Sequence, residues 1–128
     1  ALFHGSRILV VEDMKVNQML ALKILEKLGC STDAAYSGTE ALKRLEDNDY
    51  DLIFMDCQMP EMDGFEATRR IRQAELQNGK HTTIVALTAD AMTGEREKCL
   101  HAGMDDYLNK PFKPEQIADM LNKWVAHA

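Results

Sequence analysis

Polar side chains follow four short apolar runs of the chain. Glu12 and Asp13 follow one run and Asp56 follows another, while Thr88 and Lys110 each end a later run. The carboxyl ends of parallel strands lie at the same edge of a sheet. If the runs are parallel strands, this edge carries three carboxylates, a hydroxyl group and an ammonium group.

Such a cluster has the parts that phosphoryl transfer needs. Three carboxylates held together repel one another, which raises some of their pKa values unless a cation is present. Oxygen ligands of this kind suit Mg²⁺, with Mn²⁺ as an alternative. The metal and a lysine can hold the oxygens of a phosphoryl group, the hydroxyl group can donate a hydrogen bond, and a carboxylate can attack in line.

Each of these residues also has an ordinary explanation when it is taken alone. Asp13 could cap a helix, and Asp56 could belong to a turn before Pro60. Thr88 could simply end a strand, and Lys110 could be a solvated lysine. The joint placement at four strand ends favours the functional interpretation.

Short apolar runs alternate with longer patterns that are typical of helices. The continuous apolar run at 7–11 is typical of a strand buried on both faces. A capping box at 37–40 and a proline at position 114 predict two helix starts. Strands are expected at 7–11, 31–36, 51–55, 82–88 and 106–110, and helices at 14–28, 37–47, 63–76, 90–103 and 114–126. This alternation predicts an α/β domain with a five-stranded parallel sheet, doubly wound with five helices.

The composition indicates one acidic domain. The 128 residues allow a single core, and the formal net charge of -6 argues against nucleic-acid binding through a basic face. No apolar run approaches the ~20 residues of a membrane span, and the N-terminus lacks a signal-peptide core, so we expect a cytoplasmic chain without direct membrane contact. Residues 1–6 match no element and are expected to be a tail or linker remnant before a domain at 7–127. Cys30, Cys57 and Cys99 form no CxxC pair and are expected to be reduced thiols.

Four segments resemble the receiver domains of response regulators in two-component signalling. They are VEDMKVNQ (11–18), MDCQMPEMDG (55–64), ALTADA (86–91) and MDDYLNKPF (104–112). The similarity runs from about Arg7 to Trp124 and implies the flavodoxin-like (βα)₅ receiver fold. The sequences of these segments are most similar to receiver domains attached to hybrid sensor histidine kinases. Met14 departs from that branch, which commonly has asparagine there.

The resemblance implies a role for each member of the polar cluster. Asp56 is the phosphoacceptor and also a ligand of Mg²⁺. Asp13 binds the metal directly, Glu12 acts mainly through water, and the backbone carbonyl of Gln58 is the other protein ligand. Lys110 contacts the Asp56 carboxylate first and the phosphoryl group after phosphorylation.

The same resemblance implies a conformational switch. Thr88 hydrogen-bonds a phosphoryl oxygen and moves towards it, Tyr107 then turns inward, and Ala89 leaves room for that rotation. The Lys110–Pro111 peptide bond is cis, as is typical of the family. Gln58 and Asp90 influence dephosphorylation.

The helix expected at 14–28 is unusually apolar. The face expected in the core consists of Leu20, Ala21, Ile24, Leu25 and Leu28. Met19 and Leu22 point away from the centre of that face. They are either covered by loops or, as the resemblance suggests, form a docking patch for a helical phosphotransfer domain.

These features lead us to expect a phosphoacceptor receiver domain in a phosphorelay. A histidine kinase or a histidine phosphotransfer domain donates the phosphoryl group, since none of the four histidines of this chain has the setting of a phosphodonor. The domain catalyses its own phosphorylation and dephosphorylation and is expected to be a monomer. It either acts alone or is excised from a hybrid kinase.

Two other classes of protein share part of this pattern. A metal-dependent phosphohydrolase would use Asp56 as its nucleophile, but Gln58 stands where a second carboxylate is usual, and the chain has no spare length for a cap. A nucleotide-binding module would need a GxGxxG or P-loop motif after the first strand, and the sequence has neither.

Overall fold

Strands and helices alternate along the computed structural model, which describes residues 3–89 and 94–125. The elements are β1 (Arg7–Val11), α1 (Lys15–Lys27), β2 (Ser31–Ala35), α2 (Gly38–Asp47), β3 (Leu52–Asp56), α3 (Gly64–Asn78), β4 (Thr83–Thr88), α4 (Arg96–Ala102), β5 (Asp106–Asn109) and α5 (Pro114–Trp124). The strands form one five-stranded parallel sheet in the order β2-β1-β3-β4-β5, as predicted. None of the helices in the described ranges is long and apolar enough to cross a membrane.

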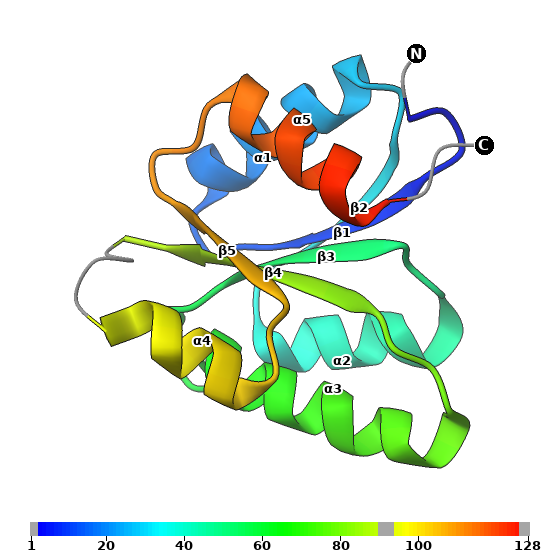
Figure 1. The fold of residues 1–128 in the computed structure, drawn as a ribbon, viewed down its shortest axis with the longest axis vertical. Helices are drawn as coiled ribbons and strands as arrows, with labels where there is room; N and C mark the ends of the chain where they lie inside the picture. Colours follow the sequence, from blue (N-terminus) through cyan, green and yellow to red (C-terminus); the bar gives the residue numbers. More distant parts are fainter. Residues whose placement is uncertain (1–2, 90–93, 126–128) are drawn as a thin grey trace.

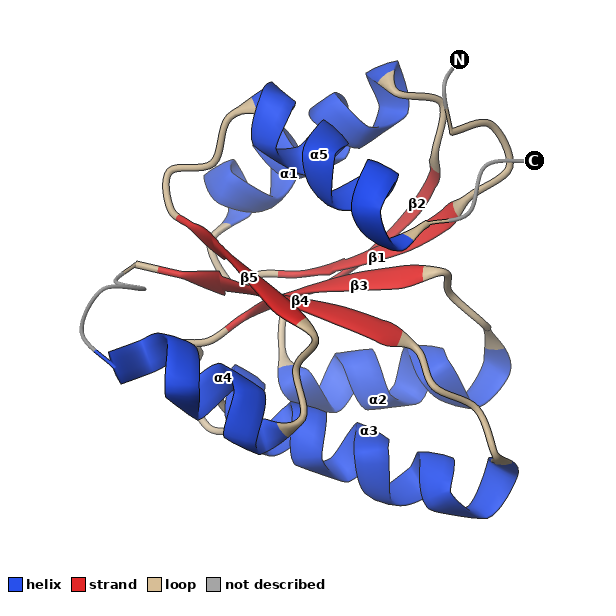
Figure 2. Ribbon diagram, viewed as in Figure 1, coloured by secondary structure: helices blue, strands red, loops and turns tan. Residues whose placement is uncertain are grey.

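Helices cover both faces of the sheet. Helices α1 and α5 lie on one face, and α2, α3 and α4 lie on the other (Figures 1 and 2). The chain places β2 on one side of β1 and then returns to add β3 on the other side. The direction of winding therefore changes between β1 and β3, and ligands of doubly wound sheets bind beside such a point, at the carboxyl ends of the strands.

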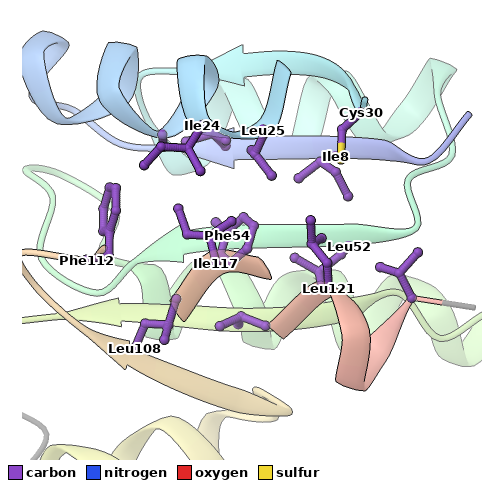
Figure 3. Packing of buried hydrophobic residues seen from close by; sticks show 14 of the residues in the cluster. Ile8, Ile24, Leu25, Cys30, Leu52, Phe54, Leu108, Phe112, Ile117 and Leu121 are labelled. Carbon is purple, nitrogen blue, oxygen red and sulfur yellow. The ribbon is translucent and has the colours of Figure 1, made fainter. Parts of the chain in front are cut away.

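The sheet separates two hydrophobic clusters because its central strands are buried on both faces. Every residue of β3 is buried. Leu52 and Phe54 belong to the cluster under α1 and α5, whereas Ile53 and Met55 belong to the cluster under α2, α3 and α4. Figure 3 shows the first cluster, in which side chains of α1 and α5 pack against the sheet. A strand with two buried faces needs a continuous apolar run, which explains the sequence pattern.

Local signals start the helices at the predicted places. The side chain of Ser37 accepts a hydrogen bond from the backbone N–H of Glu40 at 3.1 Å and begins α2. The Asp63 carboxylate accepts one from the N–H of Glu66 at 2.9 Å and begins α3. Helix α5 begins at Pro114. These caps satisfy N–H groups that have no partner within the helix.

The helix predicted at 90–103 corresponds to α4, and its predicted start lies outside the described residues. Helix α4 covers Arg96–Ala102 and ends before Gly103, whose φ of +107° favours glycine. A Cβ atom at Gly103 would also lie 2.9 Å from Cγ of Arg72. The expected cap of this helix, Asp90, lies outside the described residues.

The buried face of α1 differs from the prediction. Leu20 is 46% exposed, so its expected place in the core was wrong, whereas Gln18 is only 2% exposed. Leu22 was expected to point away from the core but packs partly against the cluster under α1 and α5. The helix is rotated in this way because the Gln18 amide donates to the backbone carbonyls of Glu12, at 3.2 Å, and Ala35, at 3.1 Å.

The segment before β1 contributes to the core, in contrast to the tail expected for residues 1–6. Phe3 is buried in the cluster under α1 and α5, and its N–H donates to the carbonyl of Leu28 at 3.0 Å. The carbonyl of Ser6 accepts a hydrogen bond from the N–H of Ser31 at 2.8 Å. Residues 3–6 are therefore bound to the domain by both packing and hydrogen bonds.

Candidate functional site

Three carboxylates meet at the carboxyl ends of β1 and β3. Glu12 and Asp13 directly follow β1, Asp56 ends β3, and the two strands pair in parallel. One carboxylate oxygen of each residue lies within 4.8 Å of the other two. The structure thus brings together the three carboxylates that the sequence placed at one edge. Asp13 does not cap α1, because the residue at the cap position is Met14.

Lys110, which directly follows β5, brings a positive charge to this cluster. Its backbone N–H donates to the carbonyl of Thr88 at 2.8 Å, and its peptide bond to Pro111 is cis, as the resemblance implied. The Lys110 Nζ atom lies 2.7 Å from Oε1 of Glu12 and 3.0 Å from Oδ1 of Asp56. One ammonium group is therefore shared between two carboxylates that are almost completely buried.

Burial and crowding change the affinities of these groups for protons. Burial, with Glu12 close by, raises the pKa of Asp56 to about 7, although Lys110 and the N–H of Gln58 oppose this change. Burial alone would raise the pKa of Glu12, but hydrogen bonds with Asp56 and Lys110 lower it below its ordinary value. Burial alone would lower the pKa of Lys110, but its two carboxylate partners raise it. Without a metal, Asp56 is thus the carboxyl group that holds a proton most readily.

The backbone beside Asp56 leaves no room for a side chain at Gly64. A Cβ atom at Gly64 would lie only 2.2 Å from the carbonyl oxygen of Asp56. The N–H of Gly64 donates to the carbonyl of Cys57 at 3.1 Å, and the N–H of Gln58 donates to the Asp56 carboxylate at 3.1 Å. The glycine therefore allows the loop after β3 to fold back tightly beside Asp56.

Thr88 ends β4 and is held by a residue that the sequence analysis missed. Its hydroxyl group donates to Oε1 of Glu95 at 2.7 Å, and the threonine is 1% exposed. Glu95 lies immediately before α4. The only sequence signal for this contact is an acidic residue at the start of the helix that follows the strand.

Tyr107 on β5 has a similar link to the start of α4. Its ring packs partly against the cluster under α2, α3 and α4, and the guanidinium carbon of Arg96 lies 5.6 Å from the ring centroid. This distance suits a cation–π contact. The consecutive residues Glu95 and Arg96 therefore contact both of the residues predicted to act as the switch.

The remaining described candidate residues differ in exposure and position. Gln58 and Ala89 are exposed, next to the ends of β3 and β4. Met19 lies on α1 and is 46% exposed, whereas Leu22 is half-buried. Gln18 was not predicted as a site residue, yet its amide fixes the carbonyl of Glu12.

The donor set of the cluster suits a divalent cation. Three carboxylates face one ammonium group, so the cluster has a net negative charge when all three are ionised. Hard oxygen ligands favour Mg²⁺, Ca²⁺ and Mn²⁺ over softer metals. The cluster of Glu12, Asp13 and Asp56 could therefore bind a metal ion.

Comparisons with known proteins show the family to which the chain belongs. The sequence model of the response regulator receiver domain family matches residues 8–122 of this chain. The chain is 46% identical over 126 residues to hybrid signal transduction histidine kinase B of Dictyostelium discoideum, which covers 91% of this chain and 6% of that protein. It is 42% identical to histidine kinase 3 of Arabidopsis thaliana, over 91% of this chain and 13% of that protein.

Solved structures show the same fold. The receiver domain of sensor histidine kinase PA1611 from Pseudomonas aeruginosa PAO1, with a magnesium ion in its active-site cleft, has a TM-score of 0.85 and 46% identity, covering 94% of this chain and 97% of that one. A co-crystal structure from Saccharomyces cerevisiae contains the histidine phosphotransfer protein Ypd1 and the receiver domain of the response regulator Ssk1. Its matching chain has a TM-score of 0.90 and 34% identity, covering 97% of this chain and 91% of that one.

The chain belongs to the response regulator receiver domain family of two-component signalling. Its curated relatives include hybrid histidine kinases, of which it spans a small part, 6% of one and 4% of another. The family match gives no support to a phosphohydrolase.

Proposed function

We propose that Asp56 accepts a phosphoryl group from a phosphohistidine donor, with Mg²⁺ bound beside it. The observation that carries this proposal is the placement of Asp56, whose buried carboxylate lies 3.0 Å from Nζ of Lys110 and beside the carboxylates of Glu12 and Asp13. A nucleophile needs a fixed position and a charged surrounding for the phosphoryl oxygens. The rigid end of β3 and the ammonium group of Lys110 supply both.

The metal site of this proposal uses oxygen atoms from two loops. Asp13, Asp56 and the carbonyl of Gln58 would hold Mg²⁺ directly, and Glu12 would act through water. When bound, Mg²⁺ neutralises the carboxylates and the incoming phosphoryl oxygens. The buried amide of Gln18 fixes the backbone that carries Glu12 and Asp13. The relative from Pseudomonas aeruginosa that holds magnesium in its cleft supports this choice of metal.

The contacts of Thr88 and Tyr107 support the switch that we propose. In the proposed reaction, the Asp56 carboxylate attacks the phosphorus atom of the donor phosphohistidine, and the P–N bond breaks so that the donor imidazole leaves. Lys110 moves its ammonium group from the carboxylate to a phosphoryl oxygen. The Thr88 hydroxyl group leaves Glu95 to donate to another phosphoryl oxygen. Tyr107 then turns inward past Ala89. Phosphorylation thereby favours one of two conformations that already exist.

The proposed donor is a histidine kinase or a histidine phosphotransfer domain, and the proposed parent protein is a hybrid kinase. The yeast complex of a receiver domain with a phosphotransfer protein supports the second kind of donor. The exposed apolar side chains of α1 are a suitable docking surface, which we name the α1 patch. It consists of Met14, Val16, Met19 and Leu20. Leu22, which the sequence suggested for this role, is half-buried and adds less to the patch.

Intact mass spectrometry tests the acceptor. The wild-type chain and Asp56→Asn are incubated with acetyl phosphate, with Mg²⁺ or with EDTA. We expect the mass of one phosphoryl group, removable by hydroxylamine, on the wild type and only with Mg²⁺. An equal gain on Asp56→Asn would exclude Asp56 as the acceptor, and a gain in EDTA would exclude the metal requirement.

A further inference from the structure

Two buried thiols face each other beside the phosphoacceptor. The Sγ atoms of Cys57 and Cys99 lie 3.8 Å apart, and the residues are 1% and 0% exposed. Cys57 directly follows Asp56 at the end of β3, and Cys99 lies in α4. Cys30 is also free but belongs to the cluster on the opposite face of the sheet. The pair therefore joins the acceptor strand to α4, and the third cysteine provides an internal control.

The two sulfur atoms are close to the separation at which they could bond. Disulfide sulfurs lie ~2.05 Å apart, so the pair must approach by roughly 2 Å. Cys57 is fixed, since its N–H donates to the carbonyl of Leu87 at 3.0 Å and its carbonyl accepts from Gly64 at 3.1 Å. Cys99 lies on a helix of only seven residues. A rotamer change with a small displacement of α4 is the movement that would close the gap.

A covalent bond at this position would act on the switch through α4. Glu95, immediately before the helix, accepts the hydrogen bond of Thr88, and Arg96, at its first position, covers the ring of Tyr107. Cys99 follows one turn later on the same segment. A bond from Cys99 to the end of β3 would fix this segment against the sheet and preserve both contacts.

We propose that Cys57 and Cys99 form a reversible intramolecular disulfide when the protein meets a peroxide, and that this bond locks α4 in its unphosphorylated position. The regulatory role rests on the proposed function, whereas formation of the disulfide does not. One thiol attacks a peroxide oxygen and becomes a sulfenic acid, releasing water. The second thiol attacks that sulfur, the S–S bond forms, and a second water leaves with the remaining thiol hydrogen. Both cysteines are oxidised, hydrogen peroxide is reduced to two waters, and a dithiol reverses the reaction by exchange.

The burial of the thiols makes the reaction depend on local opening. Hydrogen peroxide reaches the sulfurs only when α4 briefly separates from the sheet. Conditions that hold α4 closed should slow oxidation. Global unfolding would expose Cys30 as well and would lose the selectivity for this pair.

Oxidation in native buffer tests the formation of the bond. The protein is treated with hydrogen peroxide without denaturant, and its intact mass and non-reducing peptide map are recorded. We expect a loss of two hydrogen atoms and a peptide pair joining Cys57 to Cys99, in the wild type and in Cys30→Ser. Neither Cys57→Ser nor Cys99→Ser should give it, and a dithiol should reverse it. Three results would overturn the proposal. They are disulfide-linked peptides that contain Cys30, a Cys57–Cys99 disulfide that forms only in urea, and oxygen adducts on single thiols without a disulfide.

A second experiment uses NMR amide chemical shifts to test whether the disulfide holds α4 in its unphosphorylated position. Reduced and oxidised Cys30→Ser protein are phosphorylated with acetyl phosphate and Mg²⁺. We expect both to gain the phosphoryl group, but only the reduced protein to show the resulting shift changes in α4 and β5. Equal shift changes in the two forms would overturn the lock. If the reduced protein gains no phosphoryl group, the proposed function fails, and the peptide map still decides whether the disulfide forms.

Discussion

The carboxyl group of Asp56 lies in surroundings that an ionised carboxylate usually avoids. It is 2% exposed and lies beside the carboxylates of Glu12 and Asp13. Lys110 is positioned to compensate for only part of this negative charge, because its ammonium group is shared with Glu12. Buried carboxylates with too little compensation take up a proton or bind a cation. This choice is the physical basis of the metal-dependent nucleophile that we propose.

Replacing Asp56 by asparagine should stabilise the metal-free protein in a pH-dependent manner. The pKa of Asp56 is about 7 in the folded protein, above its ordinary value of 3.8. Between these values the folded state holds a proton that the unfolded state has lost, so wild-type stability falls as the pH rises and levels off above about 7. The free energy of unfolding of Asp56→Asn should not fall in this way, because asparagine has no proton to lose. At pH 8 in EDTA we expect its free energy of unfolding to exceed that of the wild type by about 1–3 kcal/mol.

Urea unfolding from pH 4 to pH 8 measures this difference. The exposed carboxylate of Asp119 provides the control, and Asp119→Asn should behave as the wild type does. Added Mg²⁺ should reduce the advantage of Asp56→Asn, since the proposed metal site exists only in the folded wild type. A difference that is the same at pH 4 and pH 8 would contradict the proposed proton.

Weakening the contact between Glu95 and Thr88 should favour phosphorylation. Glu95→Gln keeps an acceptor for the Thr88 hydroxyl group but removes the charge that strengthens the hydrogen bond. The loss of about 1 kcal/mol from the unphosphorylated state corresponds to roughly a fivefold effect. We therefore expect acetyl phosphate to label Glu95→Gln about 2–5-fold faster, as measured by intact mass over time. Glu97→Gln, in the exposed first turn of α4, is the matched control, and an equal acceleration by both variants would indicate a general effect of charge.

At the scale of the helices, the two faces of α1 have different roles. Its inner face holds Gln18, which binds the ends of β1 and β2. Its outer face carries the α1 patch, whose side chains are 46–76% exposed. The patch begins beside the acid cluster, since the N–H of Met14 donates to the carboxylate of Glu12 at 3.3 Å. A partner bound there would lie next to Asp56.

A charge in the α1 patch should slow transfer from a protein donor alone. Met19→Lys places an ammonium group in the proposed interface, where desolvation opposes binding. We expect phosphotransfer from a histidine phosphotransfer domain to slow by about 5–10-fold, with an unchanged rate from acetyl phosphate. Leu76→Lys is the control, because Leu76 is 86% exposed on α3. Equal slowing with both donors, or by both variants, would exclude the patch as a docking surface.

Arg72 of α3 connects several elements of the domain at the end of the sheet that lies opposite the acid cluster. Its guanidinium group donates to the carbonyls of Thr82 at 2.7 Å and Gly103 at 2.9 Å. It also pairs with the carboxylates of Glu75 at 2.7 Å and Asp105 at 2.8 Å. One side chain therefore connects α3, the start of β4 and the loop between α4 and β5. The site chemistry and this structural network lie at opposite ends of the strands.

Removing the Arg72 network should reduce stability without affecting the site. Arg72→Met keeps much of the side-chain length but leaves two largely buried carboxylates without their cation. We expect a loss of about 2–4 kcal/mol in the free energy of unfolding and an unchanged rate of labelling by acetyl phosphate. Arg69→Met, whose ion pair with Glu66 is exposed, should cost about 0.5 kcal/mol or less. Similar losses in both variants would contradict the assigned role of the network.

Sequence alone determined the features that depend on neighbouring residues. The continuous apolar runs predicted the strands because a strand buried on both faces has no polar positions. Ser37, Asp63 and Pro114 marked helix starts because their interactions are formed within one turn. The meeting of Glu12, Asp13 and Asp56 could also be predicted, since the ends of parallel strands share one edge.

Only the tertiary structure decided the contacts that depend on how a helix is rotated and where a loop ends. Periodicity placed Leu20 in the core, but the two hydrogen bonds of Gln18 rotate α1 and leave Leu20 exposed. The pairing of Cys57 with Cys99 joins residues 42 positions apart, and the sequence suggested three unrelated thiols. The contact of Thr88 with Glu95 likewise depends on how α4 lies on the sheet. Such contacts are set by the packing of whole elements, which no local pattern of residues specifies.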